Sequence, residues 1–154
     1  MLSEMFRRAT ANKVAWAMIN KPYIWGGDDP VRGFDCSGLV LEILRSVNLM
    51  PKKGDYSADA IAHYFDSVQM MYRGCLVFFL SPDKKYYSHI EYCIDDELSI
   101  GASGGGRSTL NQQDAISQNA YVKIRPVKNP ALITDPFKKN PKWWIGDGRF
   151  MGID

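Results

Sequence analysis

The spacing of apolar residues changes about halfway along the chain, and this change restricts the possible folds more than any other feature. In residues 36–47 apolar side chains recur three and four positions apart, which is the period of an amphipathic helix. Residues 75–80 and 89–94 are instead short apolar runs, rich in β-branched and aromatic residues, as in strands. Because helices come first and strands follow, the sequence predicts an α+β fold with N-terminal helices packed on a central antiparallel β-sheet.

The predicted elements form one domain with a C-terminal extension. They are a helix capped by Ser3 within residues 1–20, a loop at 21–30, helices at 36–47 and 57–65, and strands at 75–80, 89–94, 98–102 and 121–127. A polar turn at 95–97 makes the second and third strands a hairpin. We assign residues 1–127 to the domain and predict that residues 128–154 pack on it as an extension.

Composition excludes several functional classes. The net charge is +2, from 19 basic and 17 acidic residues, which is too even for a dedicated nucleic-acid binder. No apolar run approaches the ~20 residues of a membrane helix. The three cysteines have no paired spacing, which argues against a disulfide framework or a Cys-x-x-Cys metal site. The first 20 residues lack the pattern of a signal peptide, so we expect synthesis in the cytoplasm without that export route.

Cys36 is the first candidate for chemistry. It follows Gly33-Phe34-Asp35 and begins a predicted helix, where the helix dipole and unpaired N–H groups favour a thiolate. The same N–H groups can hold an oxyanion during attack on a carbonyl. The alternative is a small buried side chain, and residue type alone does not separate the two roles. Cys75 and Cys93 lie within apolar strands, where we expect them to pack.

His89 is the candidate base for such a nucleophile. It begins a predicted strand after a polar loop, whereas His63 lies within a helix and is expected to be structural or exposed. Nucleophilic Cys and basic His residues are commonly distant in sequence and joined by the fold. Strand alternation places Glu91 on the same face as His89, so Glu91 is the candidate to orient the ring. Ser103 or a backbone carbonyl is the alternative.

Tyr23 is a candidate donor to the same oxyanion. It lies just before Gly26-Gly27, and its hydroxyl could act beside the Cys36 N–H. The alternative is an aromatic wedge between loop and core, which residue type alone favours. Trp25 belongs to the same loop.

Four segments of the chain resemble the NlpC-type bacterial cell-wall peptidases, namely Tyr23–Gly27, Gly33–Val40, Gly74–Phe79 and His89–Tyr92. These are papain-like cysteine peptidases that cut the stem peptides of peptidoglycan. The resemblance covers about residues 13–127. It implies a papain-like fold in which the Cys lies at the N-terminus of a helix packed on the sheet.

The resemblance implies a role for each matching residue. Cys36 would be the nucleophile, His89 the base, and Tyr23 a partner of the Cys36 N–H in the oxyanion hole. The stem peptide, in some members through its free amino terminus, would be bound by Asp35, Ser37 and Trp25. The bond cut would join D-γ-glutamate to a diamino acid, with no metal or cofactor required.

The chain departs from the family pattern at two positions. A third polar residue, often His, usually follows the catalytic His, and that position falls at Gly101 here. Either Glu91 takes the orienting role, or the enzyme acts through a Cys–His dyad. Loss of activity is the third explanation, against which the retained Tyr23, Cys36 and His89 argue. The second departure is Cys75 in place of Asp, from which we expect no catalytic effect.

Other functions remain open at this stage. A domain that grips wall peptide without cutting it, or a structural part of a virion, would lack turnover. A papain-like amidase or acyltransferase on another substrate would share the nucleophile. A wall hydrolase without a signal peptide needs another route to the wall. We therefore expect a bacteriophage-encoded member of the family, with a phage tail or a secretion machine as partner. The basic and aromatic segment Phe137–Trp144 either contacts wall polymer or a partner, or packs Trp143 and Trp144 on the domain.

Overall fold

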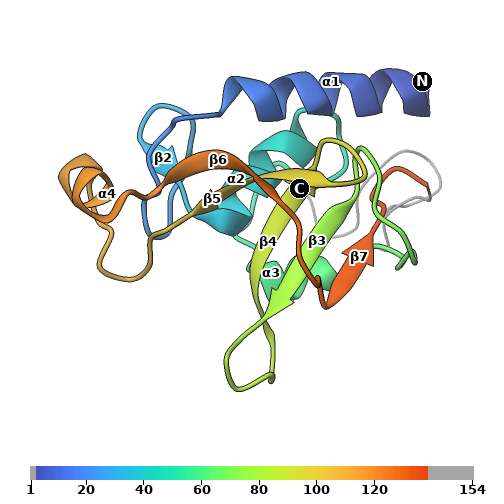
Figure 1. The fold of residues 1–154 in the computed structure, drawn as a ribbon. Coiled ribbons are helices and arrows are strands. Elements are labelled where there is room, and N and C mark those ends of the chain that lie inside the picture. Colours follow the sequence, from blue (N-terminus) through green and yellow to red (C-terminus); the bar gives the residue numbers. More distant parts are fainter. Residues whose placement is uncertain (1–2, 139–154) are drawn as a thin grey trace.

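A computed structural model describes residues 3–138, which form a layer of helices on an antiparallel sheet (Figure 1). In chain order the elements are α1 (Glu4–Ala17), β1 (Asp28–Asp29), β2 (Gly33–Phe34), α2 (Cys36–Arg45), α3 (Ala58–Ala62), β3 (Leu76–Leu80), β4 (Tyr87–Cys93), β5 (Leu98–Ser103), α4 (Gln112–Gln118), β6 (Tyr121–Pro126) and β7 (Leu132–Thr134). The predicted α+β class and the order of its main elements are therefore confirmed.

The main sheet of the described residues has the strand order β6-β5-β4-β3-β7, and all of its neighbouring strands are antiparallel. Strands β3 to β6 are neighbours in sequence as well as in space. β7 then returns to the far edge and pairs with β3, where Val77 lies opposite Ile133. Residues 132–134, within the predicted extension, thus belong to the main sheet, while Trp143 and Trp144 lie outside the described residues.

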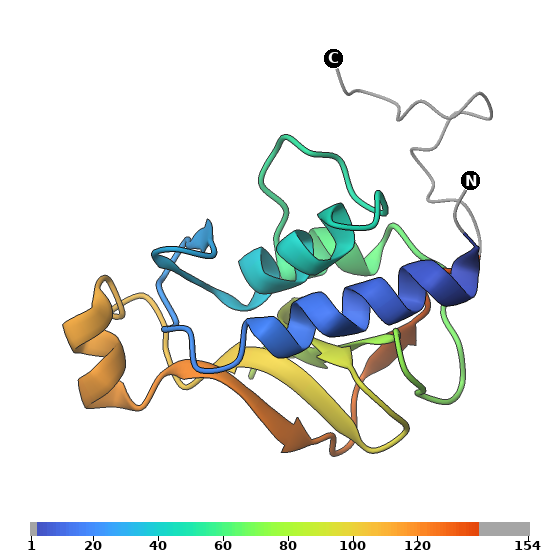
Figure 2. The same ribbon diagram turned by 90° about the horizontal axis from the view of Figure 1, so that it is seen from above.

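The hydrophobic core lies between the sheet and the helices. Figure 2 shows α1 and α2 side by side on one face of the sheet. Alternate strand residues such as Phe78, Ile90 and Tyr92 point into this core and are fully buried. A smaller buried cluster is formed by residues that alternate with core residues along the same segments, namely Cys75, Val77 and Cys93. Burying side chains of this size stabilises the fold by about 1.5–3 kcal/mol each.

Short polar side chains fix where the helices begin. The Phe6 N–H donates to Ser3 Oγ (3.2 Å), and the Ala60 N–H donates to Ser57 Oγ (3.1 Å), so both predicted caps are confirmed. The third helix ends at Ala62 rather than Phe65. There the His63 Nδ1 lies 2.7 Å from the Asp59 carbonyl oxygen, at the helix C-terminus. His63 is exposed, as the sequence predicts, and its ring contacts only its own helix in the bond described.

The prediction missed α4, β7 and the small ribbon of β1 and β2. Of the α4 residues only Ala115 is buried, so the sequence there carries no apolar period. β7 has three residues and lies between two prolines, and it becomes a strand because the edge of β3 supplies its partners. β1 and β2 have two residues each, within and just after the predicted loop.

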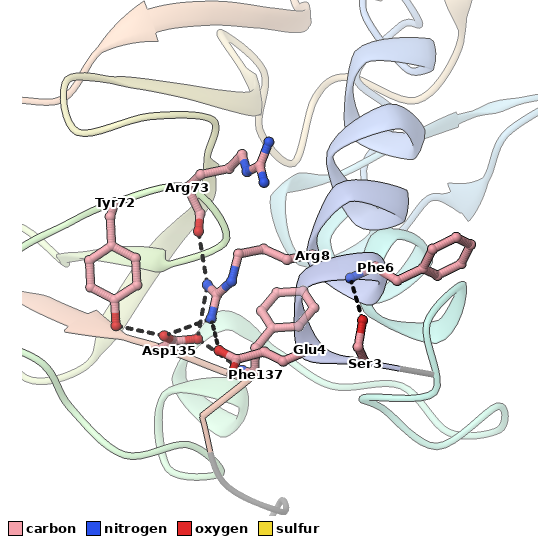
Figure 3. Close-up of polar contacts among 8 residues, drawn as sticks. All are labelled: Ser3, Glu4, Phe6, Arg8, Tyr72, Arg73, Asp135 and Phe137. Carbon is pink, nitrogen blue, oxygen red and sulfur yellow. Dashed lines mark hydrogen bonds and ion pairs between the residues drawn. The ribbon is translucent and has the colours of Figure 1, made fainter. Parts of the chain in front are cut away.

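Arg8 joins the first helix to the end of the sheet (Figure 3). Its guanidinium donates to both carboxylate oxygens of Asp135, which follows β7, at 3.3 and 3.2 Å. It also donates to the Arg73 carbonyl oxygen at 2.8 Å. The Tyr72 hydroxyl donates to Asp135 at 2.6 Å, so a buried carboxylate holds three separate segments together.

Candidate active site

Asp35 fixes the start of the helix that carries Cys36. Its Oδ1 accepts hydrogen bonds from the Gly38 N–H (2.7 Å) and the Ser37 hydroxyl (3.3 Å). Its Oδ2 accepts from the Gly26 N–H at 3.2 Å. Burial raises the pKa of Asp35 and outweighs the opposing effect of these hydrogen bonds. The carboxylate thus ties the preceding loop to the first turn of α2.

Glycines allow the loop and the helix to approach closely. The Asp35 N–H donates to the Gly27 carbonyl oxygen at 3.0 Å. A Cβ at position 38 would overlap this same oxygen, and a Cβ at position 27 would lie 2.6 Å from the Gly33 carbonyl oxygen. Cys36 is therefore held at the first turn of α2, where its side chain remains partly exposed.

His89 meets Cys36 from the sheet. The Cys36 Sγ lies 3.9 Å from the Ser88 carbonyl oxygen, and the Cys36 side chain and the His89 ring line the same groove, close enough to interact. The ring of Phe79, on β3, packs against the imidazole with centroids 5.9 Å apart. Burial lowers the pKa of His89, but the hydrogen bonds and charges of Cys36 and Glu91 outweigh burial and raise it to about 9. The ring therefore carries a proton at neutral pH.

Glu91 lies beside the Nε2 of His89. Its side chain is 1% exposed, and its Oε2 lies 3.5 Å from the His89 Nε2. Burial alone would raise the pKa of Glu91. Its hydrogen bonds with His89 and Arg125 outweigh burial and hold that pKa below its ordinary value. Glu91 is therefore an anion beside the ring.

Arg125, on β6, is a site residue that the sequence analysis missed. Its Nε donates to both carboxylate oxygens of Glu91, at 2.5 and 3.0 Å. Its Nη2 lies 3.1 Å from the His89 Nε2. In the sequence Arg125 resembles Lys123, because both alternate with buried or half-buried apolar residues as solvent-facing residues of an edge strand do. Only the register of three strands brings Arg125 to His89.

Tyr23 lies beside Cys36 and is 6% exposed. A Cβ at Gly105 would overlap its ring, so the loop after β5 packs directly on it. Burial, followed by the charges of Cys36 and Asp35, raises the pKa of Tyr23. The phenol therefore keeps its proton and remains a hydrogen-bond donor.

A larger and a smaller groove meet at Cys36, with volumes of about 610 and 340 Å³. The larger is acidic and aromatic, and its lining includes Asp35, Ser37, Asp55, Asp59, Tyr86 and Tyr87. The smaller is lined by His89, Ser103, Gly104, Gly105 and Arg125. Trp25, 47% exposed, lines both grooves, and the Arg107 guanidinium lies 5.9 Å from the centre of a Trp25 ring.

The fold thus collects the residues that the sequence analysis selected. Tyr23, Cys36 and His89 line the smaller groove, and the buried Glu91 contacts His89. Asp35, Ser37 and Trp25 line the larger groove. Within residues 3–138 there is no group of three or more His, Cys, Asp or Glu side chains that could hold a metal ion. In the same range, none of the helices combines the length and apolar character of a membrane span.

Comparisons with known proteins identify relatives of this chain. The NlpC/P60 family model matches residues 20–126. The chain is 32% identical over 94 residues to the probable endopeptidase YafL of Escherichia coli K12, covering 58% of this chain and 37% of YafL. It is 29% identical over 121 residues to the murein DD-endopeptidase MepH of the same bacterium, covering 75% of this chain and 44% of MepH. The chain thus spans less than half the length of either relative.

Solved structures show the same fold. The NlpC/p60 domain of the peptidoglycan hydrolase SagA superposes with a TM-score of 0.61 at 25% identity, over 83% of this chain and 97% of that domain. The peptidoglycan hydrolase RipB of Mycobacterium tuberculosis superposes with a TM-score of 0.67 at 18% identity, over 88% of this chain and 67% of that one.

Proposed function

The chain belongs to the NlpC/P60 family, and on this basis we propose that it is a cysteine peptidase that hydrolyses amide bonds in peptidoglycan stem peptides. The observation that carries the proposal is the contact between Cys36, at the N-terminus of α2, and His89, at the point where two grooves meet. The endopeptidase and peptidoglycan hydrolase names of the relatives support it.

The proposed reaction begins with the Cys36 thiolate, whose proton resides on His89. The His89 Nε2 faces Glu91 and Arg125, which leaves Nδ1 for the thiol and the substrate. The thiolate attacks the amide carbon, and the oxyanion that forms is held by the Cys36 N–H and the Tyr23 hydroxyl. His89 then donates its proton to the leaving amine, the C–N bond breaks, and a thioester remains. Water, deprotonated by His89, attacks the thioester and releases the acid and the thiolate.

The charge of the larger groove supports an amine-bearing substrate. Asp55 and Asp59 line it together with Asp35, and these carboxylates attract an ammonium group such as a peptide amino terminus. We propose that this groove holds the acyl part of the stem peptide, with Ser37 and Trp25 against it. The bond cut would then join D-γ-glutamate to a diamino acid. A phage tail or a secretion machine, predicted from the sequence, is the proposed vehicle to the wall.

The test compares wild type with Cys36→Ala on defined peptidoglycan fragments, with products read by mass spectrometry. Cys75→Ala is the matched control, because it removes a thiol that is fully buried outside the site. We expect wild type and Cys75→Ala to cut and Cys36→Ala to leave the fragments intact. Hydrolysis by Cys36→Ala would exclude the mechanism. Intact fragments with wild type, together with a Cys36 that resists alkylation, would favour a binding domain.

A further inference from the structure

Side chains from β4 and β6 fill the space beside His89, next to a glycine on β5. His89 and Glu91 are two residues apart on β4 and share one face. On β5, Gly101 lies against Glu91: a Cβ there would be 2.5 Å from the Glu91 Cγ, 2.7 Å from its Cδ and 3.0 Å from its Oε2. Real Cβ atoms essentially never make contacts this short. The carboxylate therefore occupies a space that only a glycine at position 101 leaves open.

Arg125 reaches the same space from β6. On this strand Arg125 lies opposite Ser99 of β5, and its side chain crosses β5 to reach the carboxylate. The side chain of Arg125 is 43% exposed and that of Glu91 is 1% exposed. Two hydrogen bonds from one guanidinium nitrogen fix the position of the carboxylate, which Ser99 Oγ also approaches at 3.4 Å.

The Nε2 of His89 faces both charges of this pair. A carboxylate can only accept a hydrogen bond from a protonated Nε2, whereas a guanidinium can only donate to an unprotonated one. Glu91 at 3.5 Å therefore stabilises the protonated ring, and Arg125 at 3.1 Å opposes it. The remaining titratable neighbour of the ring that the contacts identify is Cys36 on α2, while β3 presents the uncharged ring of Phe79.

We propose that Arg125 is a positioning residue for His89: it fixes the Glu91 carboxylate against Nε2 and offsets its charge, in a space left open by Gly101. The inference rests on the proposed function. A base that holds its proton too tightly is a poor acid toward the leaving amine. Glu91 orients the His89 ring and stabilises the proton on it. Arg125 weakens this stabilisation, so that His89 can pass the proton to the leaving amine.

The two charges predict opposite effects on the pH dependence of kcat/KM. In Arg125→Met the decline at high pH, which reports loss of the His89 proton, should move to higher pH. In Glu91→Gln it should move to lower pH. Both variants should lower kcat by about tenfold to hundredfold with little change in KM, because the ring loses its fixed orientation. Arg125→Lys keeps the positive charge. In this variant the decline of kcat/KM at high pH should return to its wild-type position, and kcat should be partly restored.

Lys123→Met is the matched control. It removes a cation from the same strand. The Lys123 Nζ donates to the Asn119 carbonyl oxygen, away from His89. It should leave both kcat and the pH limb unchanged. Arg125→Met behaving like Lys123→Met would overturn the proposal. A shift of Arg125→Met in the same direction as Glu91→Gln would do the same, because Arg125 would then only keep Glu91 ionised.

Alkylation of Cys36 by iodoacetamide gives the same comparison without substrate. In the pH profile of the alkylation rate, the step at high pH at which the thiolate loses its protonated partner His89 should move to lower pH in Glu91→Gln and to higher pH in Arg125→Met. Wild type that cuts no fragment but shows these opposite shifts would contradict the proposed substrate and support the inference. Wild type that cuts while neither variant changes either readout would support the function and exclude the inference.

Discussion

The His89 Nε2 lies 3.5 Å from the Glu91 Oε2, on one face of β4, while the residue between them, Ile90, is buried in the core on the other face. This alternation lets one strand serve the core and the site together. The relationship also sets the charge state of the proposed base, from which the first prediction follows.

The stability of the fold should decline as the pH rises from about 6.5 to about 9. The pKa of His89 is raised from its ordinary value of 6.5 to about 9, so the folded state binds this proton more tightly than the unfolded state does. The stabilisation is complete below pH 6.5 and is lost as the pH rises through 9. Urea unfolding of wild type and His89→Gln at several pH values measures it. An equal decline in both proteins would exclude His89 as the source.

Tyr23→Phe should lower kcat by about 10²–10³-fold, which is the effect of removing one oxyanion donor. The ring that packs against Gly105 is kept, so the unfolding midpoint should stay near that of wild type. Tyr86→Phe is the matched control, because it removes a hydroxyl from the larger groove. Full activity in Tyr23→Phe would assign Tyr23 to packing alone.

Substitutions of Asp35 should separate its cap from its proposed role in binding. Asp35→Ala should lower the free energy of unfolding by about 0.5–2 kcal/mol, because α2 loses its N-cap. Asp35→Asn keeps an oxygen for the Gly38 N–H and should lose less stability. If Asp35 also binds an amino terminus, Asp35→Asn should raise KM for fragments with a free amine. An unchanged KM would leave Asp35 a purely structural residue.

Asp135→Ala should lower the free energy of unfolding by about 3–5 kcal/mol, because it leaves the guanidinium of Arg8 without its buried partner. The Arg8 and Asp135 side chains are 12% and 1% exposed. Glu4→Ala removes the exposed partner of the same guanidinium and should change stability by less than about 1 kcal/mol. Equal effects in urea unfolding would contradict the central role of Asp135.

Local patterns were sufficient to predict most of this fold. The caps at Ser3 and Ser57 and the placement of Glu91 beside His89 depend on residues a few positions apart. Such relationships survive in any fold that keeps the helix or the strand.

Features that depend on distant partners could not be predicted in this way. Arg125 reaches Glu91 across 34 positions of sequence, through the register of three strands. β7 is a strand only because β3 offers an edge, and α4 has too few buried residues to give a period. The family resemblance marked Gly101 as an empty position. The structure shows that Glu91 and Arg125 occupy the space around it.

The contact between Gly101 and Glu91 also couples mutations at the two positions. A side chain added at position 101 would overlap Glu91, so the Glu91 side chain would have to shift or be replaced by a smaller one. A lineage that moved the polar group from β4 to β5 would therefore pass through an ancestor in which the contact of Glu91 with His89 is displaced or lost. Selection on the site acts on these two positions as a pair, and substitutions at one change which substitutions are tolerated at the other.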